Sequence, residues 1–176
     1  LEPISLVKGS LETTKKVSPA FFKHDLSSYK IIPIWKSAIT FENTEAVHLI
    51  QITDCHIHND SARLLSGVNT YDSLQQVMDG INSCSKPVDL AVVTGDLTHE
   101  GDERAYRLLL EQLQRLPVPF FWLPGNHDHT APMGNPASHE RLHTKQIILR
   151  DWQILLLDSH VEDEVAGAVS QSELTW

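Results

Sequence analysis

Three short polar clusters carry side chains suited to divalent metals and phosphate chemistry. Each directly follows an apolar run, and the three are Asp54-Cys55-His56, Gly95-Asp96 and Gly125-Asn126-His127-Asp128. Buried parallel strands read as continuous apolar runs, and ligand sites in open α/β sheets lie beyond the carboxyl ends of such strands. We therefore expect the clusters to meet at one sheet edge. Carboxylate oxygens and imidazole nitrogens there would suit Zn, Fe or Mn better than Ca.

The first two clusters each have a plain structural alternative. Asp54 and His56 stand two positions apart, so both would point to one face at the tip of a strand. Alternation turns Cys55 to the opposite face and predicts a buried thiol rather than a ligand. Asp96 could give both carboxylate oxygens to two metals, or it could simply cap its turn. Taken singly, each pattern is also typical of an ordinary strand-end turn.

The Gly-Asn-His-Asp run is the most specific of the three. Asn126 offers a neutral carbonyl oxygen, and His127 could act as a general acid or stabilise charge on a phosphate. Asp128 could orient that imidazole. The alternative is a polar, Gly-rich turn. His58 and His99 flank the motifs, and we interpret both as surface or substrate-rim residues rather than ligands.

Strands alternating with helices must position these clusters. Apolar runs predict strands over 47–53, 88–94 and 118–123. Apolar residues at helical spacing predict helices over 71–84, with Thr70 as N-cap, and over 102–116. Residues 145–149 and 153–157 are typical of a hairpin with a turn at Arg150-Asp151. The β-α-β-α-β order favours an α/β fold with a mostly parallel sheet.

The two ends of the chain are less regular. Residues 1–45 show no clean period and predict a poorly structured extension, so the domain is expected over 46–176. Residues 129–143 are typical of a loop with a short helix after Ser138. The run from Ser170 to Glu173 fits a capping box at a helix start. Because Trp176 falls within the first turn, we expect that the chain is cut where a helix begins.

Composition limits the partners. The 176 residues suit one domain, and a net charge of −9 disfavours binding to nucleic acid. The two cysteines suit free thiols in a reducing cytoplasm, and no apolar run approaches a membrane span. We therefore expect a cytoplasmic protein with a small-molecule substrate and without nucleic-acid or membrane partners. The oligomeric state stays open.

Together the clusters resemble the calcineurin-like metallophosphoesterase superfamily, whose motifs are Asp-x-His, Gly-Asp and Gly-Asn-His-Asp in this order. The stretch from Gly95 to Gly101 also matches the common Gly-Asp-Leu-x-x-x-Gly form. Other stretches are similar to the bacterial cyclic-AMP phosphodiesterase branch of that superfamily. These are residues 50–54, 65–70, 122–128 and 152–159. The resemblance covers about residues 38–176.

This resemblance implies a calcineurin-like four-layer α/β/β/α sandwich and two divalent metal ions, Fe2+ or Mn2+ first, with Zn2+ as an alternative. Asp54 and His56 would hold one metal, Asp96 would bridge, and Asn126 would hold the other. The implied reaction is hydrolysis of 3',5'-cyclic AMP to AMP by a metal-bridging hydroxide, with His127 protonating the leaving oxygen. The substrate phosphate would lie against His56, Asp96, Asn126 and His127.

The sequence departs from the family pattern after the third cluster. The family has a further lone His and a Gly-His-x-His turn, whereas this sequence offers only His143 and His160 downstream, in other contexts. We therefore expect the C-terminal portion of the domain to be missing from this chain. Two alternatives follow: a hydrolase of another phosphodiester or phosphomonoester, or a catalytically inactive fragment that lacks those imidazoles.

Overall fold

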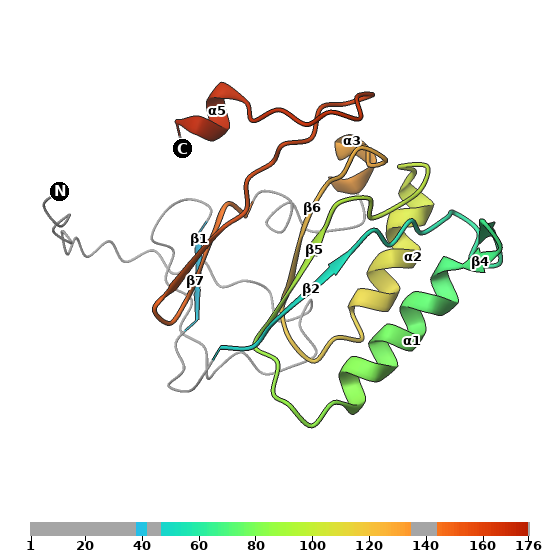
Figure 1. The fold of residues 1–176 in the computed structure, drawn as a ribbon, viewed down its shortest axis with the longest axis horizontal. Helices are drawn as coiled ribbons and strands as arrows, with labels where there is room; N and C mark the ends of the chain where they lie inside the picture. The colour runs from blue at the N-terminus through green and yellow to red at the C-terminus, as the bar shows by residue number, and fades with distance from the viewer. Residues whose placement is uncertain (1–37, 42–46, 135–143, 176) are drawn as a thin grey trace, which may run out of the picture.

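The computed structural model describes residues 38–41, 47–134 and 144–175 (Figure 1). A parallel sheet of three strands lies at its centre. In the order β2-β5-β6 these are β2 (Leu49–Thr53), β5 (Leu90–Thr94) and β6 (Phe120–Leu123). Thr53 pairs with Thr94, and Thr94 pairs with Leu123, so the three strands end in register. The loops that follow them therefore start side by side, as the sequence predicts.

Two helices cover one face of this sheet (Figure 1): α1 (Thr70–Ser83) and α2 (Glu103–Leu113). Met78 of α1 and Tyr106 of α2 are fully buried, in one cluster with Trp122 of β6. The Asp102 carboxylate caps α2 by accepting from the amide of Ala105. These helices therefore bury most of their predicted apolar stripes against the strands that lead to the polar clusters, although Val77 of α1 is exposed.

A second sheet packs against the other face of the central sheet. It has the order β1-β7-β8 and consists of β1 (Ala38–Phe41), β7 (Gln146–Leu149) and β8 (Trp152–Leu155). Strand β1 runs parallel to β7, and β7 and β8 form the predicted hairpin. Val92 and Phe121 from the central sheet are buried in one cluster with Ile147 and Leu149 from the second. The described ranges thus form an α/β/β arrangement, and the predicted α/β class with a mostly parallel sheet is confirmed.

Several local predictions differ from the structure. Ala38–Phe41 forms β1 inside the segment for which no regular element was expected, while 1–37 and 42–46 lie outside the described residues. The N-cap of α1 is Asn69 rather than Thr70, because the Asn69 side chain accepts from the amide of Asp72 at 3.0 Å. Position 138 also lies outside the described residues. The boundary between an extension and a domain at 45/46 stays a prediction.

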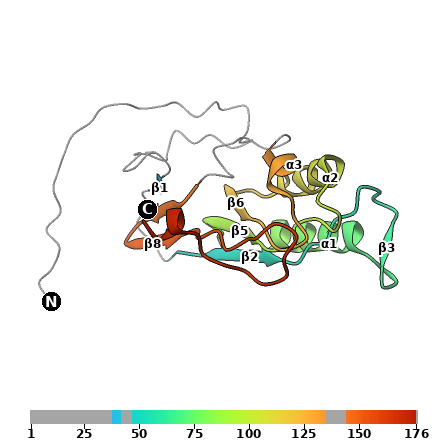
Figure 2. The ribbon, with the colours of Figure 1, turned by 90° about the horizontal axis from the view of Figure 1, so that it is seen from above.

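Short elements complete the described fold. Strands β3 (Leu64–Leu65) and β4 (Val68–Asn69) form a small hairpin at the start of α1 (Figure 2). Helix α3 (Thr130–Gly134) follows the third cluster, and α5 (Gln171–Leu174) begins at the predicted cap, where Ser170 accepts from the amide of Glu173. Within the described ranges every helix is too short or too polar to cross a membrane.

Candidate metal centre

The first two clusters form adjacent loops that extend the pairing of β2 and β5. The amide of Asp54 donates to the carbonyl of Gly95 at 3.1 Å, and that of His56 donates to the carbonyl of Asp96 at 2.9 Å. Asp54, His56 and Asp96 all have left-handed backbone conformations, with φ of 54°, 42° and 44°. Such conformations are uncommon for non-glycine residues, and they concentrate at functional sites. The strand has already ended at Thr53, so the predicted juxtaposition arises from these turns and not from strand alternation.

The side chains of Asp54, His56 and Asp96 converge beyond the strand ends. One donor atom from each lies within 4.8 Å of the other two. Nε2 of His56 lies 3.6 Å from Oδ2 of Asp96. The Thr53 hydroxyl lies 2.6 Å from Oδ2 of Asp54 and orients that carboxylate. Two carboxylates and one imidazole at this spacing fit a divalent cation. The left-handed turns hold these donors together even when no cation is bound.

The third cluster reaches the same place through a close backbone contact. The amide of His127 donates to Oδ1 of Asp96 at 3.2 Å. A Cβ added at Gly125 would lie 2.1 Å from the nitrogen of Asp96 and 2.3 Å from its Oδ1. Only glycine allows this approach. Asp96 therefore lies between His56 on one side and the loop of His127 on the other, which is the position that a bridging ligand needs.

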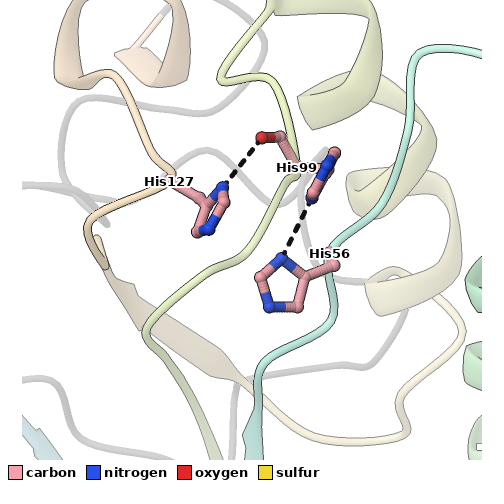
Figure 3. A group of neighbouring side chains, drawn as sticks. All are labelled: His56, His99 and His127. Atoms are coloured by element: carbon pink, nitrogen blue, oxygen red, sulfur yellow. Dashed lines mark hydrogen bonds between the residues drawn. The ribbon is translucent and has the colours of Figure 1, made fainter. Parts of the chain in front are cut away.

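The His127 ring is oriented by a carbonyl group (Figure 3). Its Nδ1 lies 3.1 Å from the carbonyl oxygen of His99. A ring nitrogen must carry a proton to bond a carbonyl, so in the neutral ring Nε2 keeps a lone pair, and in the charged ring Nε2 can donate a proton. The His127 ring stands at 82° to that of His56, with centroids 4.9 Å apart.

Asp128 has a structural role beyond the predicted one. Its side chain is fully buried and accepts hydrogen bonds from the amides of Leu97, Thr98 and Gly125 and from the hydroxyl of Tyr106. Leu97 and Tyr106 belong to the core cluster, whereas Nδ1 of the His127 ring bonds the carbonyl oxygen of His99. The contact that orients the His127 ring therefore comes from the His99 carbonyl, and the predicted role of Asp128 in orienting the imidazole stays a prediction. Asp128 ties the second cluster to the third.

His58 and His99 were expected at the surface or the substrate rim, and the structure corrects this for His58. That side chain is buried, and its Nδ1 lies 2.7 Å from Oε1 of Glu100. His99 is half-buried, and its Nδ1 lies 3.5 Å from Nδ1 of His56 (Figure 3). Burial, followed by the neighbouring His58, lowers the pKa of His99. The only sequence signal was spacing: His58 stands two residues after one predicted ligand and His99 three after another.

The remaining predicted residues have simpler surroundings. Cys55 is buried as predicted, and burial, with the nearby Asp128 second, raises its pKa to about 12, so it is a packing thiol. Asn126 is exposed and precedes His127 directly; its role as a ligand stays a prediction. His160 belongs to none of the clusters that the described residues bring together, and His143 lies outside those residues.

A parallel sheet with carboxylate and imidazole donors at its carboxyl edge defines an α/β protein with a candidate polynuclear metal centre. A comparison with family models agrees, because the model described as calcineurin-like phosphoesterase matches residues 47–165. The chain belongs to the calcineurin-like phosphoesterase family. It carries candidate His and Asp ligands for the dimetal centre that this family uses.

Curated relatives share about a third of the aligned residues. The chain is 36% identical over 132 residues to the 3',5'-cyclic adenosine monophosphate phosphodiesterase CpdA of Escherichia coli, covering 74% of this chain and 48% of the relative. It is 32% identical to a 3',5'-cyclic-nucleotide phosphodiesterase of Nostoc sp., covering 74% and 49%. A probable glycerophosphodiester phosphodiesterase, GpdQ, of Arcobacter nitrofigilis is 28% identical, covering 73% and 49%. The chain thus spans about half the length of these relatives.

Proposed function

We propose that the chain is part of a metal-dependent phosphodiesterase that hydrolyses a 3',5'-cyclic nucleotide, cyclic AMP first, to the nucleoside monophosphate. The observation that carries this proposal is the position of Asp96, whose two oxygens face His56 and the amide of His127. A carboxylate held in this way can serve two cations at once. The names of the cyclic-nucleotide phosphodiesterase relatives support the substrate class.

The proposed ligands divide between two cations. Asp54 and His56 hold the first, Asp96 serves both, and Asn126 binds the second through its exposed carbonyl group. Two divalent cations, when bound, supply positive charge for the phosphate and a more acidic water. Imidazole with carboxylate suits Fe2+, Mn2+ or Zn2+, and the family resemblance puts Fe2+ or Mn2+ first. The cations would also offset a chain charge of −9 that otherwise repels phosphate.

His127 is the proposed proton donor. Because its Nδ1 is engaged by the carbonyl of His99, its Nε2 is the nitrogen that can bind the phosphate or protonate the leaving 3' oxygen. His56, Asp96 and Asn126 stand with it as the proposed contacts of the substrate phosphate. Asp128 acts at a distance by fixing the loop. The predicted cytoplasmic location is supported by two free cysteines, Cys55 and Cys84.

The test separates cation binding from turnover. The full chain is titrated with Mn2+ and Zn2+ by calorimetry, and hydrolysis of cyclic AMP is then followed with the metal-loaded chain. We expect Asp96→Asn to abolish the binding of Mn2+ at the proposed dimetal ligands, and His127→Gln to keep it while kcat falls on the order of 10²-fold to 10⁴-fold. His48→Gln, at the opposite end of β2, is the matched control and should change neither. Equal turnover in His127→Gln and the unmodified chain would refute the role of His127.

The same samples test two alternative functions, another hydrolase substrate and an inactive fragment. The similarity to a probable glycerophosphodiester phosphodiesterase favours a second substrate class, so glycerophosphodiesters and phosphomonoesters are assayed beside cyclic AMP. Faster turnover of either would overturn the cyclic-nucleotide proposal. If the four ligands named above were the complete set, the second cation would bind weakly. Binding of fewer than two equivalents, without turnover of any substrate, would favour the inactive-fragment alternative.

A further inference from the structure

A second group of donor side chains lies beside the proposed dimetal ligands. His58, His99 and Glu100 each offer one ligand atom within 4.8 Å of the other two. Nδ1 of His58 lies 2.7 Å from Oε1 of Glu100, and the rings of His58 and His99 meet edge to face with centroids 4.7 Å apart. Neither His58 nor Glu100 has a part in the proposed reaction. The group therefore needs a separate explanation.

The backbone holds this group in place. Ile57 and Thr98 form a parallel bridge, which puts His58 directly beside His99 on neighbouring loops. The amide of His99 donates to the carbonyl of Ile57 at 3.1 Å. A bridge of this kind fixes the relative position of the two loops before any ligand binds. The donors are therefore preorganised, and a cation would lose little conformational entropy in bringing them together.

Two buried donor atoms of the group have no hydrogen-bond partner among the described residues. They are Nε2 of His58 and Oε2 of Glu100, and the His58 side chain is only 2% exposed. Buried polar atoms normally have partners, because losing water without replacement is unfavourable. With Nδ1 of His58 engaged by Oε1 of Glu100, the unpartnered Nε2 and Oε2 are the atoms left to bind a cation.

Arg63 is the cation that the group already contacts. Its guanidinium forms an ion pair with Oε1 of Glu100, and its side chain is 52% exposed. An exposed arginine is held loosely, so a divalent cation can displace it. Its positive charge nevertheless opposes such binding. Removing Arg63 should therefore tighten cation binding, an effect that a purely structural ion pair would not produce.

We propose that His58, His99 and Glu100 form a third cation site, of the zinc class, separate from the Asp54–His56–Asp96 ligands. Two imidazoles and one carboxylate are a donor set that Zn2+ uses with a fourth position open. His99 adjoins both centres, because its Nδ1 lies 3.5 Å from Nδ1 of His56. Occupation of the third site would therefore restrict the rotation of the ring beside His56. Cation binding at this site does not depend on the proposed hydrolysis.

The test isolates the third site from the dimetal ligands. The 176-residue chain carrying Asp54→Asn and Asp96→Asn is titrated with Zn2+ by calorimetry and with Co2+ by visible absorption, where four-coordinate Co2+ gives intense bands. We expect one equivalent to bind in this background. Adding His58→Phe or the nearly isosteric Glu100→Gln should weaken that binding at least tenfold, and adding Arg63→Gln should strengthen it. Adding His48→Gln, which removes a histidine outside the group, should leave it unchanged.

Several outcomes would overturn the third site. One is the absence of bound Zn2+ in the Asp54→Asn/Asp96→Asn background. A second is unchanged affinity in Glu100→Gln, whose fold is checked by circular dichroism in case His58→Phe does not fold. A third is loss of the equivalent in His127→Gln but not in His58→Phe, which would locate the cation among His56, His99 and His127 instead. Failure of cyclic AMP hydrolysis leaves each of these readouts intact, so the two proposals fail separately.

Discussion

Substitution of Asp128 by asparagine tests whether its carboxylate joins the second and third clusters. Oδ2 accepts from the amides of Leu97 and Gly125, at 2.9 and 2.8 Å. Oδ1 accepts from the amide of Thr98 at 3.0 Å and from two hydroxyls, that of Tyr106 at 3.0 Å and that of Thr98 at 3.2 Å. The residue is fully buried, so water cannot replace a lost partner. Every one of these partners donates a hydrogen bond. The side-chain amide of asparagine can accept only through its oxygen, because its nitrogen carries two protons and donates.

The expected loss follows from these contacts. If the NH2 group of the substituted side chain takes the place of Oδ2, it faces two backbone amides that cannot reorient. If it takes the place of Oδ1, it faces one such amide, while the hydroxyls can rotate. The second orientation is the less costly one: it loses the Thr98 amide bond, about 1.5–3 kcal/mol, and the two amides at the other oxygen now bond a neutral acceptor, which contributes about 1 kcal/mol less for each. Asp128→Asn should therefore lower the free energy of unfolding by about 3–5 kcal/mol. Tyr106→Phe removes one of the donors and also the acceptor of the His129 amide, so it should cost about 2–4 kcal/mol.

Urea unfolding provides the assay, because the fully buried Trp122 lies close to Tyr106, with ring centroids 6.3 Å apart, and its fluorescence should report the transition. Asp151→Asn, in the exposed β7–β8 turn, is the matched control and should stay within about 0.5 kcal/mol of the unmodified chain. The reasoning would be refuted if Asp128→Asn also stayed within that range.

Two further predictions rest on close packing beside the same loops. Gly125→Ala would place its Cβ 2.1 Å from the nitrogen of Asp96, so the two loops must separate by about 1 Å. We expect kcat for cyclic AMP hydrolysis to fall about 10²-fold, and undiminished activity would contradict the close approach. A thiol reagent at pH 8 should label Cys84 in the native chain and Cys55 only after unfolding, because burial raises the pKa of Cys55 from 9.0 to about 12. Because the pKa of Cys55 is higher in the folded chain, its contribution to the free energy of unfolding is fully present below pH 9 and should be lost as the pH rises toward 12. Urea titrations across this pH range can measure that loss. Rapid labelling of native Cys55 would contradict its burial.

The central sheet and its helices were predictable because each is encoded locally. An apolar run such as Leu90–Thr94 is typical of a strand buried on both faces, and the stripe on Glu103–Leu113 has helical spacing. Strand Ala38–Phe41 was missed because the strand it pairs with, Gln146–Leu149, lies more than a hundred residues along the chain. A four-residue strand carries too little pattern to show a pairing that distant. The helix cap at Asn69 was misplaced by one residue because two neighbouring residues are both good caps.

The candidate metal centre also has features that were predictable from the sequence and features that were not. Residue types and order predicted that Asp54, His56 and Asp96 would meet, because loops after in-register parallel strands must start side by side. The left-handed turns that aim these side chains were not predictable, since no sequence pattern marks φ near 50° in aspartate or histidine. Likewise, the sequence could not say that Asp128 faces the core.

The sequence by itself determined the donor atoms, their order and the strands that deliver them. Tertiary structure decided which donors face one another and which are withdrawn from the site. Asp128 was withdrawn because three backbone amides and two hydroxyls, from the second and third clusters' loops and from helix α2, all donate to its carboxylate. His58 and His99 were brought in because a backbone bridge pairs their loops. Such contacts depend on how segments that are far apart in the sequence pack against one another. Local sequence patterns do not show which of these segments become neighbours.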